Sequence, residues 1–440
     1  MIKNVFAITL LLLAFNLTAQ TFDNAKMDSF FAKIGANDKG MGSISIFKKG
    51  HEVYQNAFGF SDVENKFPAS AITKYRIGSI SKTFTATIIM QLVEEKKLSL
   101  NTKLAEFYPE IPNAKEITIE QLLRHRSGLY NFTNSKEYVN WMEEPHTQQD
   151  LLNRVMENEP VFEPNEKAEY SNTNYVLLSF IAEKLEDKYF STILEDRIST
   201  PCQLSNTYYG DKINPLKNEA LSYTRLQNWE LATETDMSVP LGAGAVVSNP
   251  TDLNSFYTQL FTGTLISDKS LSEMKKIVDG FGIGMFQLPF YEKKAFGHTG
   301  GIDGFQSMAA YFPEDSIAIA YTTNGVVMPM NDIMIGALSI YFGNEYTLPE
   351  FKPTLELKSE ELDQYLGVYS SPSLPIDITI TKEGNVLMGQ GTGQPKFPLE
   401  AYELHQFKFD QAMLKMEFLP KENKMILRQG GGEFEFSKKE

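Results

Sequence analysis

Apolar residues recur with a period of two near the start of this chain, with a helical period in its middle, and with a period of two again later. Between residues 42 and 60 they alternate with polar residues, which predicts a β-hairpin and the start of an antiparallel sheet. Helical spacing begins near Ser79 and continues to about Ile198, and strand patterns broken by glycines return over residues 281–321. We therefore expect one antiparallel sheet flanked by helices, with a helical region at about residues 85–235 inserted into it.

The C-terminal part of the chain adds a helix, a linker and a second set of strands. Residues 331–342 are predicted to form a helix on the sheet, and residues 347–357 read as a linker because they are polar and contain two prolines. Beyond Tyr365, strand signals separated by turns recur at residues 376–380, 407–409, 415–418 and 433–436. We expect a fold of the α/β (α+β) class in residues 20–346 and a small all-β barrel in residues 358–440.

The first 19 residues have the features of a signal peptide. Lys3 supplies a positive charge, residues 5–15 form an apolar stretch, and Ala19 is a small residue that suits cleavage. The alternative is an uncleaved anchor, but the apolar stretch is far shorter than the roughly 20 residues that a membrane-spanning helix needs. We expect an exported protein, periplasmic or extracellular, without a membrane span once the signal peptide is removed.

The charge balance narrows the classes of partner. The formal net charge is -15, and no run of Lys or Arg offsets it, so the surface repels phosphate backbones and anionic lipids. We expect no nucleic-acid partner. Cys202 is the only cysteine, which excludes an intrachain disulfide, and we expect it to be a buried apolar residue. The five histidines are scattered without a ligand motif, so no metal site is expected.

The motif S-x-x-K occurs three times, and its surroundings distinguish the three copies. Ser45 falls in a predicted strand, where alternate side chains face opposite ways, and Ser272 falls in a short charged helix that we expect to be solvated. Ser79 and Lys82 lie three residues apart at a helix start, where free backbone N–H groups can stabilise an oxyanion. We interpret Ser79 as a nucleophile that Lys82 activates.

A lysine can take a proton from serine only if its pKa falls from roughly 10, so a further group should lie nearby. The motif Y-x-N begins at Tyr54, Tyr138 and Tyr170. Tyr54 falls in a strand before the serine and Tyr138 in a polar aromatic stretch, so a core or surface position suits both better. Tyr170 can relay the proton, and the Asn172 amide can hold both Lys82 and a substrate carbonyl. Which of Lys82 and Tyr170 is the main base stays open, because coupled groups titrate as a pair.

The third candidate is Gly297-His298-Thr299-Gly300-Gly301, which contains the only K/H-T-G sequence of the chain and falls in a predicted strand. Glycines in a strand allow another backbone to come close. A substrate could pair with this edge while the Gly301 N–H joins the N–H of the nucleophile in holding the oxyanion. The alternative is a glycine bulge with His298 as a hydrogen-bonded polar residue, which this segment favours when it is taken alone.

The order of these motifs, each separated from the next by roughly a hundred residues, resembles that of serine β-lactamases and penicillin-binding proteins. The resemblance is closest to the class C branch and its relatives, and segments 75–79, 122–129 and 170–175 are similar to that branch as well. It covers about residues 25–345. It implies an antiparallel sheet flanked by helices, a site where the sheet meets the helical region, and a covalent acyl-enzyme on Ser79 without metal or cofactor. The C-terminal part resembles the small β-barrels that some members carry.

Two residues depart from the family pattern, and the first bears on the substrate. His298 replaces the usual lysine, a fixed cation that pairs with a substrate carboxylate, and we expect this histidine to be only partly charged near neutral pH. Relatives with this histidine are similar to peptidases of D-amino-acid substrates and to esterases. Asn165 stands where many relatives have glycine.

The resulting hypothesis is an exported serine hydrolase that cleaves an amide or ester bond. We expect its substrate to be a D-amino-acid peptide, such as one derived from the cell wall, or a small carboxylic ester. Ser79, Lys82 and Tyr170 would be catalytic, and Asn172 and residues 298–301, namely His298, Thr299, Gly300 and Gly301, would bind substrate. The alternatives are a β-lactamase or D-alanyl-D-alanine carboxypeptidase, and a penicillin- or peptide-binding sensor that does not turn over.

Overall fold

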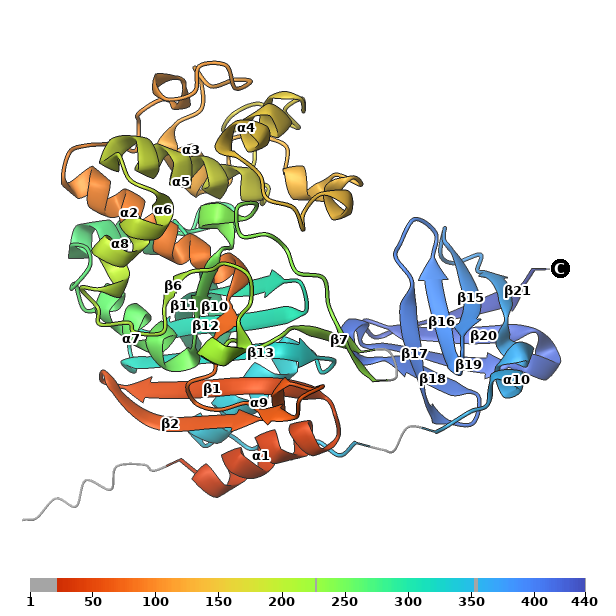
Figure 1. Cartoon of the computed structure of the whole chain (residues 1–440). Helices are drawn as coiled ribbons and strands as arrows, with labels where there is room; N and C mark the ends of the chain where they lie inside the picture. The colour runs from red at the N-terminus through yellow and green to blue at the C-terminus, as the bar shows by residue number, and fades with distance from the viewer. Residues whose placement is uncertain (1–21, 226–227, 352–354, 440) are drawn as a thin grey trace, which may run out of the picture.

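The computed structural model of this chain describes residues 22–225, 228–351 and 355–439. The predicted signal peptide, residues 1–19, lies outside the described residues. Figure 1 shows a sheet with helices packed around it, a helical region above the sheet, and a separate β-barrel at the C-terminal end. In the described part of the chain, no helix has the length and apolar character to cross a membrane.

The central sheet has six antiparallel strands in the order β10-β11-β12-β13-β1-β2. Their bounds are β1 Gly40–Lys48, β2 His51–Phe58, β10 Phe286–Phe290, β11 Lys293–Ile302, β12 Phe305–Phe312 and β13 Ile317–Val326. The first strand of the chain pairs with the last strand of this sheet, with Ile44 opposite Tyr321. The predicted closure of the early hairpin onto the later strands is therefore confirmed.

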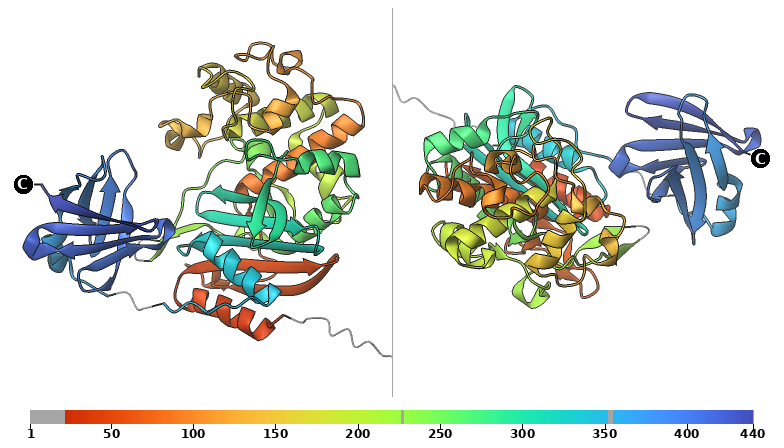
Figure 2. Two further views of the ribbon diagram at one scale, coloured as in Figure 1. Left: turned by 180° about the vertical axis from the view of Figure 1, so that it is seen from behind. Right: turned by 90° about the horizontal axis from the view of Figure 1, so that it is seen from above.

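Helices cover both faces of this sheet, which is why β1 is buried along most of its length. On one face lie α1 (Asn24–Ala36) and α9 (Met330–Phe342), whose apolar side chains share a core with β1, β2 and β13. On the other face lie α7 (Pro250–Phe261) and α2 (Ser81–Glu94), which join the larger core of the helical region. Figure 2 shows the same layers from behind and from above.

The helical region is less regular than its sequence pattern predicts. Its helices are α3 (Ile119–Leu123), α4 (Gln148–Met156), α5 (Asn172–Glu186) and α6 (Phe190–Leu194), and α8 (Asp268–Lys275) follows α7. Loops separate α3, α4, α5 and α6. Short strands lie before α2, namely β3 Phe60–Asp62, β4 Phe67–Pro68 and β5 Tyr75–Arg76, and between α6 and α7, namely β6 Tyr208–Tyr209, β7 Tyr223–Arg225, β8 Trp229–Leu231 and β9 Val246–Ser248. These loops matter for the site because they carry several of its polar side chains.

The C-terminal part is a closed barrel of eight strands, β14 to β21, preceded by α10 (Ser359–Leu362). The strands are Gly367–Ser370, Asp377–Glu383, Val386–Gly391, Phe397–Glu403, Gln406–Phe409, Leu414–Leu419, Lys424–Gln429 and Gly432–Lys438. The predicted fold class, a sheet with an inserted helical region followed by a small barrel, is confirmed. The boundaries predicted for the linker and the two domains stay a prediction.

The barrel contacts the rest of the protein through a buried cation. Lys39, which precedes β1, pairs with Glu400 of β17 at 3.0 Å and with Asp410 at 3.8 Å. Beside this contact lies a cavity of about 930 Å³ between the barrel and the tip of the β11–β12 hairpin at Asp303 and Gly304.

Candidate active site

Ser79 lies in a single 3-10 turn, Gly78–Ile80, that runs directly into α2. The sequence placed this serine at the helix start itself, but the structure places it one turn earlier. Gly78 has a φ of +51°, and a Cβ on it would lie 2.7 Å from the backbone nitrogen of Gly301. The turn thus needs glycine, both for its left-handed backbone and for the close approach of β11.

Lys82 extends from the first turn of α2 and contacts the hydroxyl of Ser79. Its Nζ lies 2.9 Å from Ser79 Oγ, 2.7 Å from Asn172 Oδ1 and 2.8 Å from the carbonyl oxygen of Ala243. The side chain is fully buried, and this burial lowers the pKa of Lys82 well below its ordinary value. A neutral amine has two N–H donors and one lone pair. Since the two carbonyl oxygens can take both donors, the lone pair remains for the hydroxyl of Ser79.

Tyr170 precedes α5 and donates a hydrogen bond from its phenol to Ser79 Oγ at 2.8 Å. Burial raises the pKa of this phenol above its ordinary value, so it is neutral at physiological pH. Its ring stacks on His125 at 4.5 Å between centroids, and Lys82 Nζ lies 4.9 Å from the ring centre. Ser79 Oγ therefore has a proton donor on one side and an amine on the other.

Asn172 is the first residue of α5, and neighbouring loop residues fix its amide. Its Nδ2 donates to Thr133 Oγ1 at 3.0 Å, which orients Oδ1 toward Lys82. Its backbone N–H donates to Asn131 Oδ1 at 3.0 Å. Nδ2 of Asn172 carries two N–H groups. Thr133 accepts from one of them, and the other remains for a substrate carbonyl.

The glycine-rich segment of β11 lies against the turn that carries Ser79. Strand β10 pairs with β11 only as far as Gly297, so beyond it this edge of β11 is open toward the 3-10 turn. A Cβ on Gly300 would lie 1.9 Å from the carbonyl oxygen of Ile77, and Ser307 on β12 donates to that same oxygen at 2.8 Å. The structure therefore brings Gly301 and Ser79 together, as their sequence contexts predict, while Thr299 faces solvent.

His298 differs from its sequence-based expectation. Its side chain is buried, and its Nδ1 lies within hydrogen-bond distance of the carbonyl oxygen of Thr299. Burial, with a smaller contribution from the charge of Lys82, lowers the pKa of His298 to about 3. The prediction of partial charge near neutral pH was therefore wrong, because the sequence does not reveal that Phe286 and Tyr170 pack beside this ring.

Sequence reasoning missed several residues that hold the site in place. The Ala243 carbonyl has no sequence signature, because any residue supplies a backbone acceptor. His125 appeared only as part of a family-like segment, yet its Nδ1 accepts from the Ser171 N–H at 3.1 Å and lies 3.3 Å from Asn174 Nδ2. Burial lowers the pKa of His125 well below its ordinary value, so its ring is neutral and its nitrogen is free to accept.

The competing motif copies lie elsewhere. Ser45 on β1 donates to Glu52, while Lys48 donates to the carbonyl of Asp315, so the two ends of that motif do not meet. Ser272 is exposed on α8. Cys202 is buried, as predicted, and burial raises the pKa of its thiol to about 11. The described residues contain no group of three or more His, Cys, Asp or Glu that could hold a metal ion.

Comparison with known proteins identifies the family. The β-lactamase family model matches residues 28–337, which is more than half of the chain. The chain belongs to the β-lactamase family. The predicted resemblance to β-lactamases and penicillin-binding proteins, and the predicted class of serine hydrolase, are thereby confirmed.

Relatives within this family extend the comparison. Penicillin-binding protein 4* of Bacillus subtilis is 28% identical over 379 residues, which covers 78% of this chain and 82% of that protein. Teichoic acid D-alanine hydrolase of Staphylococcus aureus is 24% identical, covering 63% and 69%. D-amino acid amidase from Ochrobactrum anthropi, solved with D-phenylalanine, has a TM-score of 0.66 at 25% identity, covering 73% and 99%. The octameric penicillin-binding protein homologue from Pyrococcus abyssi also gives 0.66 at 25% identity, covering 94% and 99%.

Proposed function

We propose that this protein is an exported serine hydrolase that opens an amide or ester bond through an acyl-enzyme on Ser79. The observation that carries the proposal is the convergence of Lys82 and Tyr170 on Ser79 Oγ, at 2.9 Å and 2.8 Å. Export rests on the pattern of residues 1–19.

In the first step, the neutral amine of Lys82 accepts the proton of Ser79 as Oγ attacks the substrate carbonyl. The developing oxyanion is held by the backbone N–H groups of Ser79 and Gly301. The leaving nitrogen or oxygen then receives a proton through Tyr170, whose phenol regains it from Lys82. A water molecule next attacks the acyl-enzyme by the reverse relay and releases the acid. Asn172 keeps the Lys82 amine in place and offers one N–H to the substrate.

Lys82 is the better candidate for the base of the first step. Burial favours its neutral form, which can accept a proton, whereas burial makes tyrosinate at Tyr170 costly. Tyr170 also donates its phenol proton to Ser79 Oγ in the resting site. It therefore cannot take the serine proton until its own proton has moved. We therefore assign Tyr170 to the relay toward the leaving group.

The substrate class follows from the neutral state of His298. A buried imidazole with a pKa of about 3 cannot provide the fixed cation that holds a terminal carboxylate. We infer a substrate whose leaving group is uncharged, such as a D-amino acyl amide or ester. The relatives named D-amino acid amidase and teichoic acid D-alanine hydrolase support this class. A carboxypeptidase acting on a free C-terminus is less consistent with the site.

The experiment that tests the proposal is intact mass spectrometry of the mature protein after exposure to a fluorophosphonate probe and, separately, to penicillin. We expect one fluorophosphonate adduct on the wild type and none on Ser79→Ala. Hydrolysis of D-alanine amide or D-alanine methyl ester, compared with the L-forms and with nitrocefin, then ranks the substrates.

A second candidate function, a penicillin-binding protein that does not turn over, is favoured by the similarity to penicillin-binding protein 4*. It would show as a stable penicilloyl adduct with no hydrolysis of esters or amides. If neither reagent labels the wild type, the acyl-enzyme proposal is wrong.

A further inference from the structure

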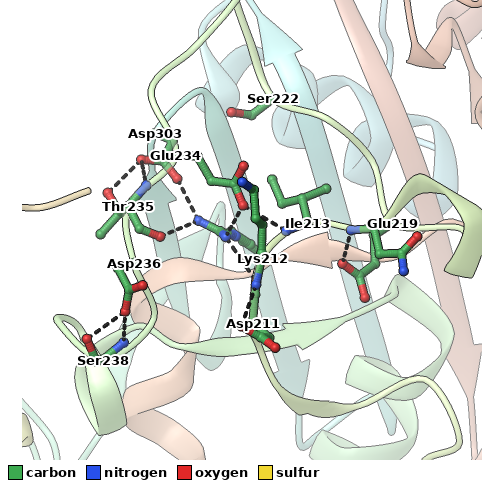
Figure 3. A network of polar contacts seen from close by, with 12 residues as sticks. Asp211, Lys212, Ile213, Glu219, Ser222, Glu234, Thr235, Asp236, Ser238 and Asp303 are labelled. Atoms are coloured by element: carbon green, nitrogen blue, oxygen red, sulfur yellow. Dashed lines mark hydrogen bonds and ion pairs between the residues drawn. The ribbon is translucent and has the colours of Figure 1, made fainter. Parts of the chain in front are cut away.

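A buried guanidinium, that of Arg76, lies three residues before the predicted nucleophile and contacts three separate segments of the chain. Nη1 of Arg76, on β5, donates to the carbonyl oxygen of Thr235 at 2.7 Å and to Asp303 Oδ2 at 3.1 Å. Its Nη2 donates to the carbonyl oxygen of Asp211 and to Glu234 Oε1, both at 3.1 Å. Figure 3 shows Asp211, the neighbouring residues Glu234 and Thr235, and Asp303 lying close together.

The ion pair between Arg76 and Asp303 links the strand that leads to Ser79 with the β11–β12 hairpin that contains Gly301. Asp303 occupies the tip of the β11–β12 hairpin, two residues after Gly301, and its side chain is 1% exposed. Oδ2 receives Arg76, while Oδ1 receives the backbone N–H of Thr235 at 3.0 Å and its hydroxyl at 2.6 Å. One carboxylate therefore fixes the hairpin tip against both the strand that leads to Ser79 and the loop at Thr235.

The turn geometry alone does not explain an aspartate here. Ile302 and Phe305 pair across a two-residue turn, and Asp303 has a φ of +51°. Asparagine and glycine adopt that backbone as readily as aspartate does, so the turn does not need the charge. A buried ion pair is also weak as a source of stability, because desolvating both charges offsets much of their attraction. The position of Asp303 is better explained if its carboxylate fixes where the hairpin tip lies.

Oxyanion stabilisation depends on where the two N–H donors stand relative to one another. Those donors belong to Ser79 and Gly301, which lie on segments joined by the Arg76–Asp303 pair and by the contact of Gly300 with the Ile77 carbonyl. A displacement of about 1 Å in such a site can lower a rate by about 100-fold.

We propose that the Arg76–Asp303 ion pair is a positioning device that sets the spacing of the two oxyanion donors. The proposal rests on the function proposed above. Arg76 and Asp303 touch neither substrate nor the reacting atoms; they act through the backbone of the 3-10 turn and of the hairpin.

The test is Asp303→Asn, which keeps the turn and removes the charge. The readout is kcat/KM for p-nitrophenyl acetate and for its thiono analogue, in which sulfur replaces the carbonyl oxygen and depends less on the oxyanion hydrogen bonds. We expect the oxo ester to lose about 10- to 100-fold and the thiono ester to lose less, so that the oxo-to-thiono ratio falls. Fluorophosphonate labelling of Ser79 should persist.

The matched control is Glu234→Gln, which removes the other carboxylate beside Arg76 without touching the hairpin. Its ester ratio should stay at the wild-type value. If Asp303→Asn does not fold, Thr235→Val removes one hydrogen bond to the same carboxylate and should change the ratio in the same direction by less.

An unchanged ratio in the folded Asp303→Asn protein overturns the proposal, and so does an equal loss for both esters, which would indicate a general structural effect. Wild-type labelling separates the two proposals. If the wild type is labelled but Asp303→Asn keeps its ratio, only the positioning role fails. If neither fluorophosphonate nor penicillin labels the wild type, the acyl-enzyme function fails and the positioning role fails with it.

Discussion

At the residue scale, the decisive feature of the site is a buried lysine that has no carboxylate partner among the described residues. Lys82 contacts a hydroxyl and two carbonyl oxygens, and burial is the cause of its lowered pKa. A charged lysine in this position would be stabilised only by dipoles, whereas a neutral amine satisfies every contact around it. Burial therefore favours the neutral amine that the proposed base role of Lys82 requires.

Replacing Lys82 with methionine should remove this base while keeping the volume of the side chain. We expect kcat/KM for an ester substrate to fall by about 100- to 10,000-fold, because general-base assistance is lost. In the wild type, activity should rise with pH through the lowered pKa of Lys82 and level off well below pH 10.5. A pH–rate profile checks this, and a rate that keeps rising to pH 10.5 would contradict a neutral lysine.

His298 gives a separate pH prediction, on stability. Its pKa is about 3 in the folded protein and 6.5 when the chain is unfolded, so between these values the unfolded state binds more protons. Stability is therefore full above pH 6.5 and is lost as pH falls toward 3. In His298→Gln, the slope of unfolding free energy against pH should shrink by up to about 1.4 kcal/mol per pH unit in this window. Urea unfolding at pH 4, 5, 6 and 7.5 measures it.

The same pH series carries its own control. His51 is exposed on β2, so His51→Gln should leave the slope unchanged. An equal slope for His298→Gln and the wild type would mean that the folded protein charges this histidine.

Residues that act through their side chains in local motifs could be predicted from the sequence, and those that depend on distant packing could not. The structure brings Ser79, Lys82 and Tyr170 together, as the sequence predicts, because spacing and helix position constrain them. The neutral state of His298 was missed because it depends on burial by Phe286, which no local pattern reveals. Ala243 was missed because its backbone carbonyl, not its side chain, does the work.

At the element scale, close backbone approach decides what the site tolerates. Strand β11 lies close to the turn at Gly78. Its glycines Gly300 and Gly301 differ in how much room they have for a side chain. A Cβ on Gly300 would lie 1.9 Å from the Ile77 carbonyl oxygen, whereas the nearest atom to a Cβ on Gly301 is 4.0 Å away. Of these two adjacent glycines, Gly300 has no room for a side chain, whereas Gly301 has room for a methyl group.

This contrast predicts different outcomes for two matched substitutions. Gly300→Ala should destabilise the fold by at least about 1–3 kcal/mol, because the methyl group must displace backbone. Gly301→Ala should stay within about 1 kcal/mol of the wild type, because its methyl group enters open space and its φ is not left-handed. Thermal and urea unfolding compare them, and equal stability of the two variants would contradict the close approach.

In the barrel, too, local sequence patterns predict only some of the strands. Four of its eight strands match the segments read from the sequence, and β16 and β17 are among those that do not. Gly389 and Gly391 interrupt the alternation in β16, and Pro398 lies within β17. Such residues weaken a strand signal, and only closure of the barrel supplies the pairing that overrides them.

At the scale of the whole molecule, a buried cation links the barrel to the hydrolase. The side chain of Lys39 is 4% exposed and pairs with Glu400 and Asp410. Nearby, the Leu355 N–H donates to the Ala401 carbonyl at 2.8 Å. Because separating a buried ion pair leaves charges without their partners, Lys39 ties the start of β1 and the barrel into one arrangement.

Replacing Lys39 with methionine should therefore loosen the barrel from the hydrolase without unfolding either part. We expect faster hydrogen–deuterium exchange at Leu355, because its N–H donates to the carbonyl of Ala401, the residue after Glu400 in β17, and unchanged exchange in β12 and β13. Lys382→Met is the matched control, because Lys382 pairs with Asp363 inside the barrel region. Ester hydrolysis should persist in both variants, because neither lysine lies near Ser79. If Lys39→Met leaves exchange at Leu355 as slow as in the wild type, the apolar contacts around the cavity, rather than the cation, hold the barrel in place.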